Sequence, residues 1–248
     1  RRQRQMCIRD RFVNAHSHAF QRLIRGRTQW RPSTGRHTEE DFWSWRGSMY
    51  GAALGLSPED VYHVARFCFL EMMRTGITAV GEFHYLHHQP DGTAYPNPTE
   101  LATRVIAAAE SVGLRIALLD VCYATGGIGR PLGERQRRFR AGSLDGYLDR
   151  VTTLAESVAG ATLAAVGVAP HSVRAVPRDW LPPIAAWAEE RNAPLHMHVA
   201  ERPAEVEECV RAYGLRPVEL LAHDGLLGDR FTAVHATHLT DREVDLLG

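Results

Sequence analysis

Histidines recur in this 248-residue sequence at or next to the ends of short apolar runs. Thirteen histidines placed at random would not fall so regularly at such ends. The pattern involves His16, His18, His84, His171, His196, His198 and His235. Neutral imidazole nitrogens bind zinc, and a catalytic zinc site typically combines three protein ligands with one water. The sequence therefore predicts a metal centre built from histidines.

The pair His16 and His18 is the first candidate for that centre. Their two-residue spacing on an extended segment directs both imidazoles to the same side. His198, at the end of another apolar run, is the natural third ligand. We predict that these three residues bind one Zn²⁺ ion, although the same ligand types also suit iron. His196 has the same parity as His198, and we expect it to be a hydrogen-bonded histidine one layer deeper in the core.

A carboxylate and a further histidine follow the predicted ligands. Glu201 comes three residues after His198, where it can take a proton from water and pass it to a leaving amine. Its alternative role is to favour the start of a helix, where negative charge is stabilising. We expect the catalytic role in this context, with His235 steadying the attacking water. His238 is expected to be a loop or capping residue.

Short apolar runs alternate with helical patterns and would have to position these residues. The expected strands are Phe12–Ala15, Ile77–Phe83, Leu114–Cys122, Ala164–Ala169, Pro194–Val199 and Phe231–Val234. The expected helices lie near 58–75, 98–112, 143–158, 178–191 and 203–213, with Ser57, Thr99 and Thr240 as capping residues. This alternation predicts parallel βαβ units. The sequence contains no G-x-G-x-x-G motif after an expected strand, which argues against a dinucleotide-binding fold. We expect a (β/α)₈ barrel, α/β in class, of which about six of eight units are represented. The carboxyl ends of barrel strands meet on one face, where active sites are found.

The amino-acid composition limits the classes of partner and of catalytic chemistry that this protein can have. Hydrophobic residues make up 44% of the chain, and the 29 basic residues balance the 29 acidic ones. This neutral balance gives no sign of nucleic acid or anionic membrane as a partner, and no apolar run is long enough to span a bilayer. The four cysteines are far apart in the sequence, so we expect reduced thiols and a cytoplasmic protein. A homodimer is a further expectation. Every basic residue is arginine, so neither a Schiff base nor a carbamylated lysine bridge is available.

Three segments are expected to lie outside this regular pattern. Residues 1–11 resemble a foreign leader and not a signal peptide. Residues 21–57 and 123–142 are expected to be long loops. The second loop is rich in Arg and Gly, and we expect it to be solvated; the alternative is a cover over an active site.

The motifs VNAHSHAFQR, HMHVAE and VHATHLT resemble the amidohydrolase superfamily over residues 12–248. Together with FWSWRGSMY, EFHYLHH, QRRF and GVAPHSVRAV, they resemble its N-formimidoyl-L-glutamate deiminase family. The resemblance implies hydrolysis of N-formimidoyl-L-glutamate to N-formyl-L-glutamate and ammonia, a step of histidine degradation. It implies His16, His18 and His198 as metal ligands and Glu201 and His235 as catalytic residues. The implied substrate-binding residues are Gln21, Arg46, Tyr85, His171 and Arg174.

The resemblance also implies parts that this sequence does not contain. The family uses an aspartate at the end of the eighth strand and a small β-sandwich domain, and we expect strands seven and eight and that domain to be absent here. The two carboxylates of the implied substrate match the guanidinium groups of Arg46 and Arg174. One alternative is a deaminase of guanine or another aromatic ring, which would need no such pair. A second alternative is a metal-binding protein without catalytic activity.

Overall fold

The computed structural model describes residues 11–27 and 40–248, with side chains from residue 45 onward in the second range. Six parallel strands form one sheet in the order β1-β2-β3-β4-β5-β6. The strands are β1 (Phe12–Ser17), β2 (Ile77–His84), β3 (Arg115–Cys122), β4 (Ala164–Pro170), β5 (Leu195–Val199) and β6 (Phe231–His235). The expected strands are therefore confirmed, and their observed ends differ by one or two residues.

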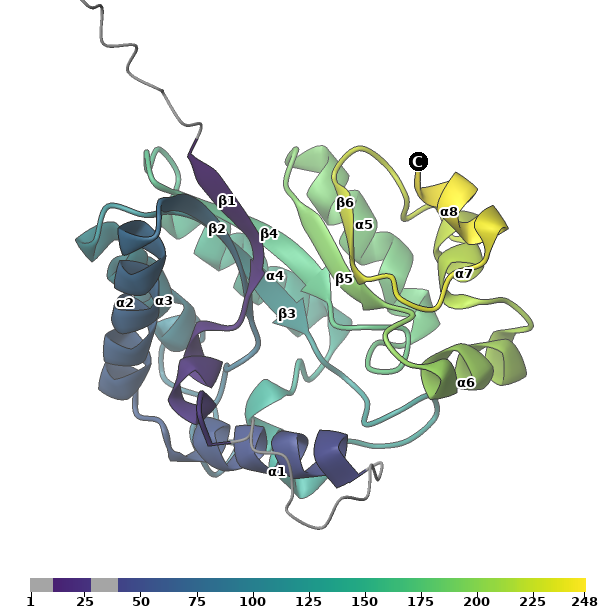
Figure 1. Ribbon diagram of the computed structural model, residues 1–248, viewed down its shortest axis with the longest axis horizontal. Coiled ribbons are helices and arrows are strands. Elements are labelled where there is room, and N and C mark those ends of the chain that lie inside the picture. Colours follow the sequence, from purple (N-terminus) through teal and green to yellow (C-terminus); the bar gives the residue numbers. More distant parts are fainter. Residues whose placement is uncertain (1–10, 28–39) are drawn as a thin grey trace, which may run out of the picture.

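The sheet curls into a nearly closed barrel with most helices on its outer side, while the helix over residues 40–55 lies across one end of the barrel (Figure 1). The curvature brings the carboxyl ends of the first and fifth strands close to each other. As a result, the ring centroids of His16 and His198 lie 4.9 Å apart. The helices are α1 (Glu40–Gly55), α2 (Pro58–Arg74), α3 (Glu100–Ser111), α4 (Leu144–Ser157), α5 (Leu181–Glu190), α6 (Pro203–Tyr213), α7 (Pro217–His223) and α8 (Asp241–Leu247). Three 3₁₀ segments accompany them: η1 (Ala19–Ile24), η2 (Glu134–Phe139) and η3 (Arg178–Trp180). This arrangement confirms the partial (β/α)₈ barrel expected from the sequence.

Local capping explains where several helices begin. Ser57 accepts a hydrogen bond from the backbone of Asp60, whose carboxylate accepts in return from Ser57, and Pro58 opens α2. Thr240 caps α8 in the same way, as expected. Thr99 occupies the N-cap position of α3, as expected, but its hydroxyl donates to Asn97 at 2.9 Å and makes no capping hydrogen bond to the helix.

A close approach between neighbouring strands explains one glycine in the barrel. A Cβ atom added to Gly81 of β2 would lie 2.5 Å from the carbonyl oxygen of Ala15 in β1. That separation is too short for a carbon and an oxygen that are not bonded, so this position requires glycine. The tight contact places β1, which contains His16, firmly against β2.

The expectation of a loop over residues 21–57 is wrong for its described parts. η1 occupies its beginning and α1 its end, while residues 28–39 lie outside the described residues. Aromatic and glycine residues in α1 have weak helical propensity, and their apolar positions do not follow a clean helical period, which hid the helix. α7 escaped prediction because it is only seven residues long. Residues 1–10 of the expected leader also lie outside the described part.

Part of the segment 123–142 is packed against the barrel, so the expectation of a solvated loop holds only for its exposed residues, 129–131, 133–135, 140 and 142. Arg138 and Phe139, both in η2, are almost completely buried. The Arg138 guanidinium donates hydrogen bonds to the carbonyl oxygens of Ala53 and Leu56, at the end of α1, and of His88, after β2. One buried side chain therefore links three segments that lie far apart in the sequence. Within the described residues, no helix has the length and apolar character needed to cross a membrane.

Candidate metal centre and active-site cavity

The three histidines expected to bind metal lie together at the carboxyl ends of β1 and β5. The Nε2 atoms of His16 and His18 are 3.1 Å apart, and the rings of His18 and His198 are stacked with centroids 5.5 Å apart. One nitrogen of each residue lies within 4.8 Å of the nitrogens of the other two. Ligand atoms at about 2.0–2.1 Å from one zinc ion are separated by up to about 4.2 Å, so small side-chain rotations would complete the site.

Backbone carbonyl groups orient two of these rings. The Nδ1 of His18 lies 3.0 Å from the carbonyl oxygen of Phe83, and the Nδ1 of His198 lies 3.2 Å from that of His171. A carbonyl oxygen can only accept, so Nδ1 carries the proton in both rings. The Nε2 lone pairs are thereby available to a metal ion, which is the usual arrangement of zinc-binding histidines.

Burial also keeps these imidazoles in the form that binds metal. Desolvation lowers the pKa of His16 to about 4 and the pKa of His18 to about 3. It lowers the pKa of His198 well below the ordinary value, and neighbouring histidines add to the effect. All three rings are therefore neutral near pH 7, as a zinc ligand must be. The donor set, its tautomers and its protonation fit a zinc ion.

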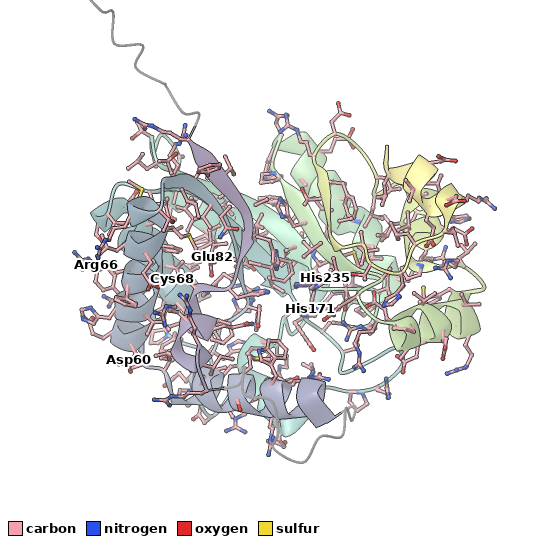
Figure 2. The ribbon with its side chains drawn as sticks, viewed as in Figure 1. Asp60, Arg66, Cys68, Glu82, His171 and His235 are labelled. Atoms are coloured by element: carbon pink, nitrogen blue, oxygen red, sulfur yellow. The ribbon has the colours of Figure 1, made fainter. Side chains whose placement is uncertain are left out.

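These histidines open onto a cavity of about 250 Å³. Every residue for which the sequence analysis predicted a metal, catalytic or substrate-binding role lines this one cavity: His16, His18, Gln21, Arg46, Tyr85, His171, Arg174, His198, Glu201 and His235. They come from β1, η1, α1, β5, β6 and the segments that follow β2, β4 and β5. Figure 2 shows His171 and His235, which belong to different strand ends, close to the same central region.

Glu201 lies at the mouth of the cavity between a cation and a histidine. Its Oε2 accepts a hydrogen bond from Nη2 of Arg174 at 3.0 Å, and its Oε1 lies 3.9 Å from Nε2 of His235. The His235 ring stacks on that of His198, with centroids 5.1 Å apart. The carboxylate, the second histidine and the three predicted ligands are thus neighbours in space.

The predicted substrate-binding residues form two hydrogen-bonded groups around the cavity. Gln21 donates to the hydroxyl of Tyr85 at 2.9 Å, and Arg46 donates to the hydroxyl of Tyr50 at 2.7 Å. The ring of His171 packs against Tyr123, with centroids 4.5 Å apart. A cavity with one carboxylate, two guanidinium groups and aromatic walls can hold a small anionic molecule beside a metal ion.

Sequence reasoning missed five residues that line the cavity: Trp45, Met49, Tyr50, Tyr123 and Phe139. All five belong to the segments expected to be loops. Their aromatic content was the available signal, because exposed loops seldom contain so many large apolar side chains. α1 and η2 therefore form walls of the cavity.

Two strand-end histidines lie outside the cavity lining. His84 is buried beside His87, with ring centroids 5.7 Å apart. His196 lies deeper in the barrel, as expected, but among the described residues its Nδ1 has no hydrogen-bond partner. His238 is a loop residue, as expected, and its backbone N–H donates to the carbonyl oxygen of Ala200 at 3.1 Å.

The barrel and its strand-end histidines define a class of protein. Residues 12–248 match the Amidohydrolase family, and the chain belongs to that family.

Individual relatives are similar over nearly the whole chain. A formimidoylglutamate deiminase from Pseudomonas aeruginosa is 38% identical over 232 residues, which is 93% of this chain and 50% of the relative. A 5-methylthioadenosine/S-adenosylhomocysteine deaminase from Thermodesulfovibrio yellowstonii is 29% identical over 95% of this chain and 46% of its own length.

Solved structures are likewise similar to nearly the whole chain. The crystal structure of an amidohydrolase from Brucella melitensis has a TM-score of 0.88 and 40% identity, covering 96% of this chain and 52% of that one. An adenosine deaminase from Xanthomonas campestris with bound zinc has a TM-score of 0.72 and 25% identity over 95% of this chain and 46% of that one. The chain therefore spans about half the length of the relatives it matches.

Proposed function

We propose that the full-length protein is a metal-dependent hydrolase that converts N-formimidoyl-L-glutamate and water into N-formyl-L-glutamate and ammonia. The observation that supports it most directly is the single cavity in which three neutral imidazoles, one carboxylate and two guanidinium groups meet. The similarity to the formimidoylglutamate deiminase of Pseudomonas aeruginosa supports the choice of substrate.

Zinc is the proposed metal, held by His16, His18 and His198. The Xanthomonas campestris relative with bound zinc supports this choice. A zinc ion supplies Lewis acidity, which makes water an effective nucleophile near neutral pH.

The residues of the chain have distinct parts in the proposed reaction. Glu201 takes one proton from the attacking water and delivers it to the terminal nitrogen, and the second proton of that water passes to the same nitrogen as the carbonyl group of the product forms. A C–O bond forms at the formimidoyl carbon, the bond from that carbon to the terminal nitrogen breaks, and ammonia departs. His235 lies near Oε1 of Glu201, whereas Arg174 contacts Oε2. His235 orients the attacking water and stabilises the negative charge that develops on its oxygen.

The charge of the cavity supports a dicarboxylate substrate. Arg46 and Arg174 both line it, and planar guanidinium groups bind carboxylates through paired hydrogen bonds. Tyr50 holds the Arg46 side chain in the cavity wall. A neutral nucleobase has no carboxylate for Arg46 and Arg174 to bind.

A second candidate is a deaminase of an adenine nucleoside or another aromatic ring. The similarity to 5-methylthioadenosine/S-adenosylhomocysteine deaminases favours it, and so do the aromatic walls at Tyr85, Tyr123 and Phe139. This candidate predicts activity on a purine nucleoside and little dependence on Arg46. A metal-binding protein without catalysis predicts zinc uptake with no turnover of either substrate.

Ammonia release separates these candidates. The zinc-loaded full-length protein is incubated with N-formimidoyl-L-glutamate or with 5′-methylthioadenosine, and ammonia is measured by a coupled assay. We expect release from the first substrate and a decrease of about 10²–10⁴-fold in Glu201→Gln. Equal rates for wild type and Glu201→Gln on formimidoylglutamate would overturn the proposal.

A further inference from the structure

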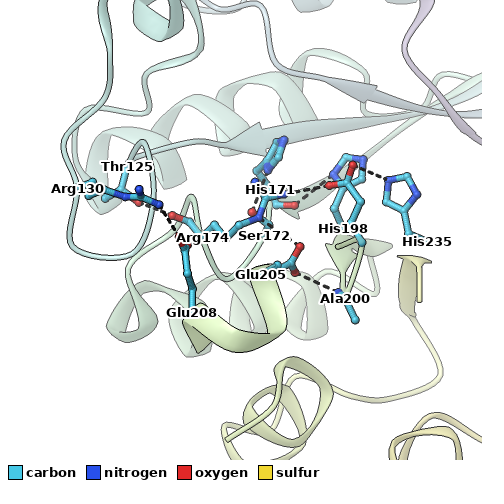
Figure 3. A network of polar contacts seen from close by, with 11 residues as sticks. Thr125, Arg130, His171, Ser172, Arg174, His198, Ala200, Glu205, Glu208 and His235 are labelled. Carbon is cyan, nitrogen blue, oxygen red and sulfur yellow. Dashed lines mark hydrogen bonds and ion pairs between the residues drawn. The ribbon is translucent and has the colours of Figure 1, made fainter. Parts of the chain in front are cut away.

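A buried carboxylate outside the predicted site connects two of its residues. Glu205 lies in the first turn of α6, and only 1% of its surface is exposed. A carboxylate this deeply buried requires hydrogen-bond partners or a neighbouring cation. Both of its oxygens have such partners within the described structure, namely Ala200 and Arg174 (Figure 3). Ala200 directly precedes Glu201 in the chain, and Arg174 donates a hydrogen bond to it.

The first oxygen of Glu205 holds the backbone turn that precedes Glu201. Its Oε1 accepts a hydrogen bond from the backbone N–H of Ala200 at 3.0 Å. Ala200 has φ +49°, in the left-handed region that non-glycine residues adopt at a cost of about 1–3 kcal/mol. Such a conformation persists only where its surroundings determine it. Glu205 on the N–H and His238 on the carbonyl group supply two of these restraints.

The second oxygen of Glu205 holds the guanidinium group that contacts Glu201. Its Oε2 accepts from Nε of Arg174 at 3.2 Å, while Nη2 of the same group donates to Glu201 at 3.0 Å. These contacts use two of the five N–H donors of a guanidinium group, which leaves three donors for a substrate carboxylate.

We propose that Glu205 is a positioning residue for the reaction. One carboxylate fixes both the Ala200 turn, which aims Glu201 into the cavity, and the guanidinium group of Arg174, which binds the substrate anion. It thereby sets the distance between the group that transfers the proton and the group that receives the charged end of the substrate. This inference rests on the proposed function of the cavity.

The charge balance around Glu205 agrees with this role. Burial raises the pKa of the Glu205 carboxyl, and the adjacent Arg174 guanidinium acts in the opposite direction. Glu201 adds a second negative charge near the same guanidinium. Removing the charge of Glu205 would release Arg174 toward Glu201 alone and leave the N–H of Ala200 with a weaker partner.

The chain offers a matched control on the same helix. Glu208 lies three residues further along α6 and pairs with Arg130 at 2.9 Å. The side chain of Arg130 is 63% exposed, and the pair does not contact Glu201. Glu208→Gln therefore repeats the substitution on α6 without touching the connection to the cavity.

A double-mutant cycle tests the proposal in the zinc-loaded full-length enzyme. Wild type, Glu205→Gln, Arg174→Gln and the double variant are compared by kcat and KM for N-formimidoyl-L-glutamate, with zinc content and Tm as checks on folding. We expect Glu205→Gln to lower kcat/KM by about 10- to 100-fold through both a higher KM and a lower kcat, with about one zinc per chain retained. When Arg174 is already replaced by glutamine, adding Glu205→Gln should no longer raise KM but should still lower kcat. Glu208→Gln should stay within about twofold of wild type.

Two results would overturn the proposal. One is a Glu205→Gln enzyme whose kcat and KM both stay within about twofold of wild type; the other is the same KM increase with and without Arg174, since independent residues act additively. If Glu205→Gln does not fold, Glu205→Asp, which keeps the charge but shortens its reach, replaces it in the cycle. The proposed function is judged separately, by the wild type. If the wild type deaminates only an adenine nucleoside, the expected loss of kcat in Glu205→Gln is measured on that substrate.

Discussion

The Nδ1 atom of His18 lies 3.0 Å from the carbonyl oxygen of Phe83 on the neighbouring strand. This contact decides which nitrogen of His18 faces the cavity, because the carbonyl group can pair only with a protonated Nδ1. β2 therefore takes part in the metal centre through its backbone, although none of its own residues is a predicted ligand. The ligand set depends on the register between β1 and β2 as much as on the histidines themselves.

Replacing His18 by alanine should abolish stable zinc binding. The substitution removes one of three protein ligands, and we expect zinc to fall from about one ion per chain to a small fraction of that. Metal content after dialysis, measured by mass spectrometry, checks the prediction. His63→Ala is the matched control, because His63 lies on the exposed face of α2 beside Glu59. Full zinc retention in His18→Ala would rule out the proposed centre.

Replacing Arg46 by glutamine should weaken binding of the dicarboxylate substrate. Loss of a hydrogen bond to a charged group costs about 1.5–3 kcal/mol, so we expect KM to rise about 10- to 150-fold, with a smaller change in kcat. Steady-state kinetics with N-formimidoyl-L-glutamate measure both constants. Arg115→Gln, at the amino end of β3 and exposed, should change neither. An unchanged KM in Arg46→Gln would favour the aromatic-ring deaminase.

Acid should destabilise the metal-free protein below about pH 6.5. Burial lowers the pKa of His84 to about 3 and the pKa of His196 to about 4, whereas both titrate near 6.5 in the unfolded chain. The unfolded state therefore binds more protons as the pH falls through this window, and folding stability decreases. We expect a loss on the order of 2 kcal/mol per group between pH 7.5 and 5, measured by urea unfolding.

Variants assign this pH dependence to particular histidines. His196→Asn should make the decrease in stability shallower, because its buried imidazole no longer contributes. His63→Asn, at a side chain that is 64% exposed, is the control for replacing a histidine elsewhere in the chain. A stability that is constant from pH 7.5 to 5 would show that these buried rings are not kept neutral by folding.

Replacing Gly81 by alanine should loosen the first strand. The added Cβ would meet the Ala15 carbonyl oxygen at 2.5 Å, and relieving that overlap should cost about 1–3 kcal/mol of unfolding free energy. Because Ala15 precedes His16, zinc affinity should fall as well. Gly51→Ala in α1 is the control, as nothing lies within 4 Å of its added Cβ and alanine favours a helix by about 0.5–1 kcal/mol. Equal unfolding midpoints for Gly81→Ala and wild type would contradict this account.

The strand framework and the cavity residues were predictable because they rest on local patterns. The H-x-H spacing gives the side of the strand, and the rule that parallel strands end on one face brings His16, His198 and His235 together. The structure places all ten predicted residues on one cavity; their individual roles stay predictions.

The missed features depend on contacts between distant segments. Tyr123 and Phe139 lie in a segment whose composition resembles a solvated loop, and only the packed barrel shows that they form a wall. Glu205 has the appearance of an ordinary acidic residue in a first helical turn. Its proposed positioning role depends on its two hydrogen-bond partners, Ala200 and Arg174. No local sequence pattern indicates the contact with Arg174, which lies 31 residues earlier in the chain.

Arg138 gives the cavity an unusual mechanical property. This one guanidinium group donates hydrogen bonds to carbonyl oxygens at the end of α1 and after β2, so it ties α1 and η2, two walls of the cavity, to each other. Opening the cavity by displacing α1 would also pull η2, and with it Phe139, outward. A substitution at Arg138 should therefore disturb two cavity walls at the same time, although Arg138 itself does not line the cavity.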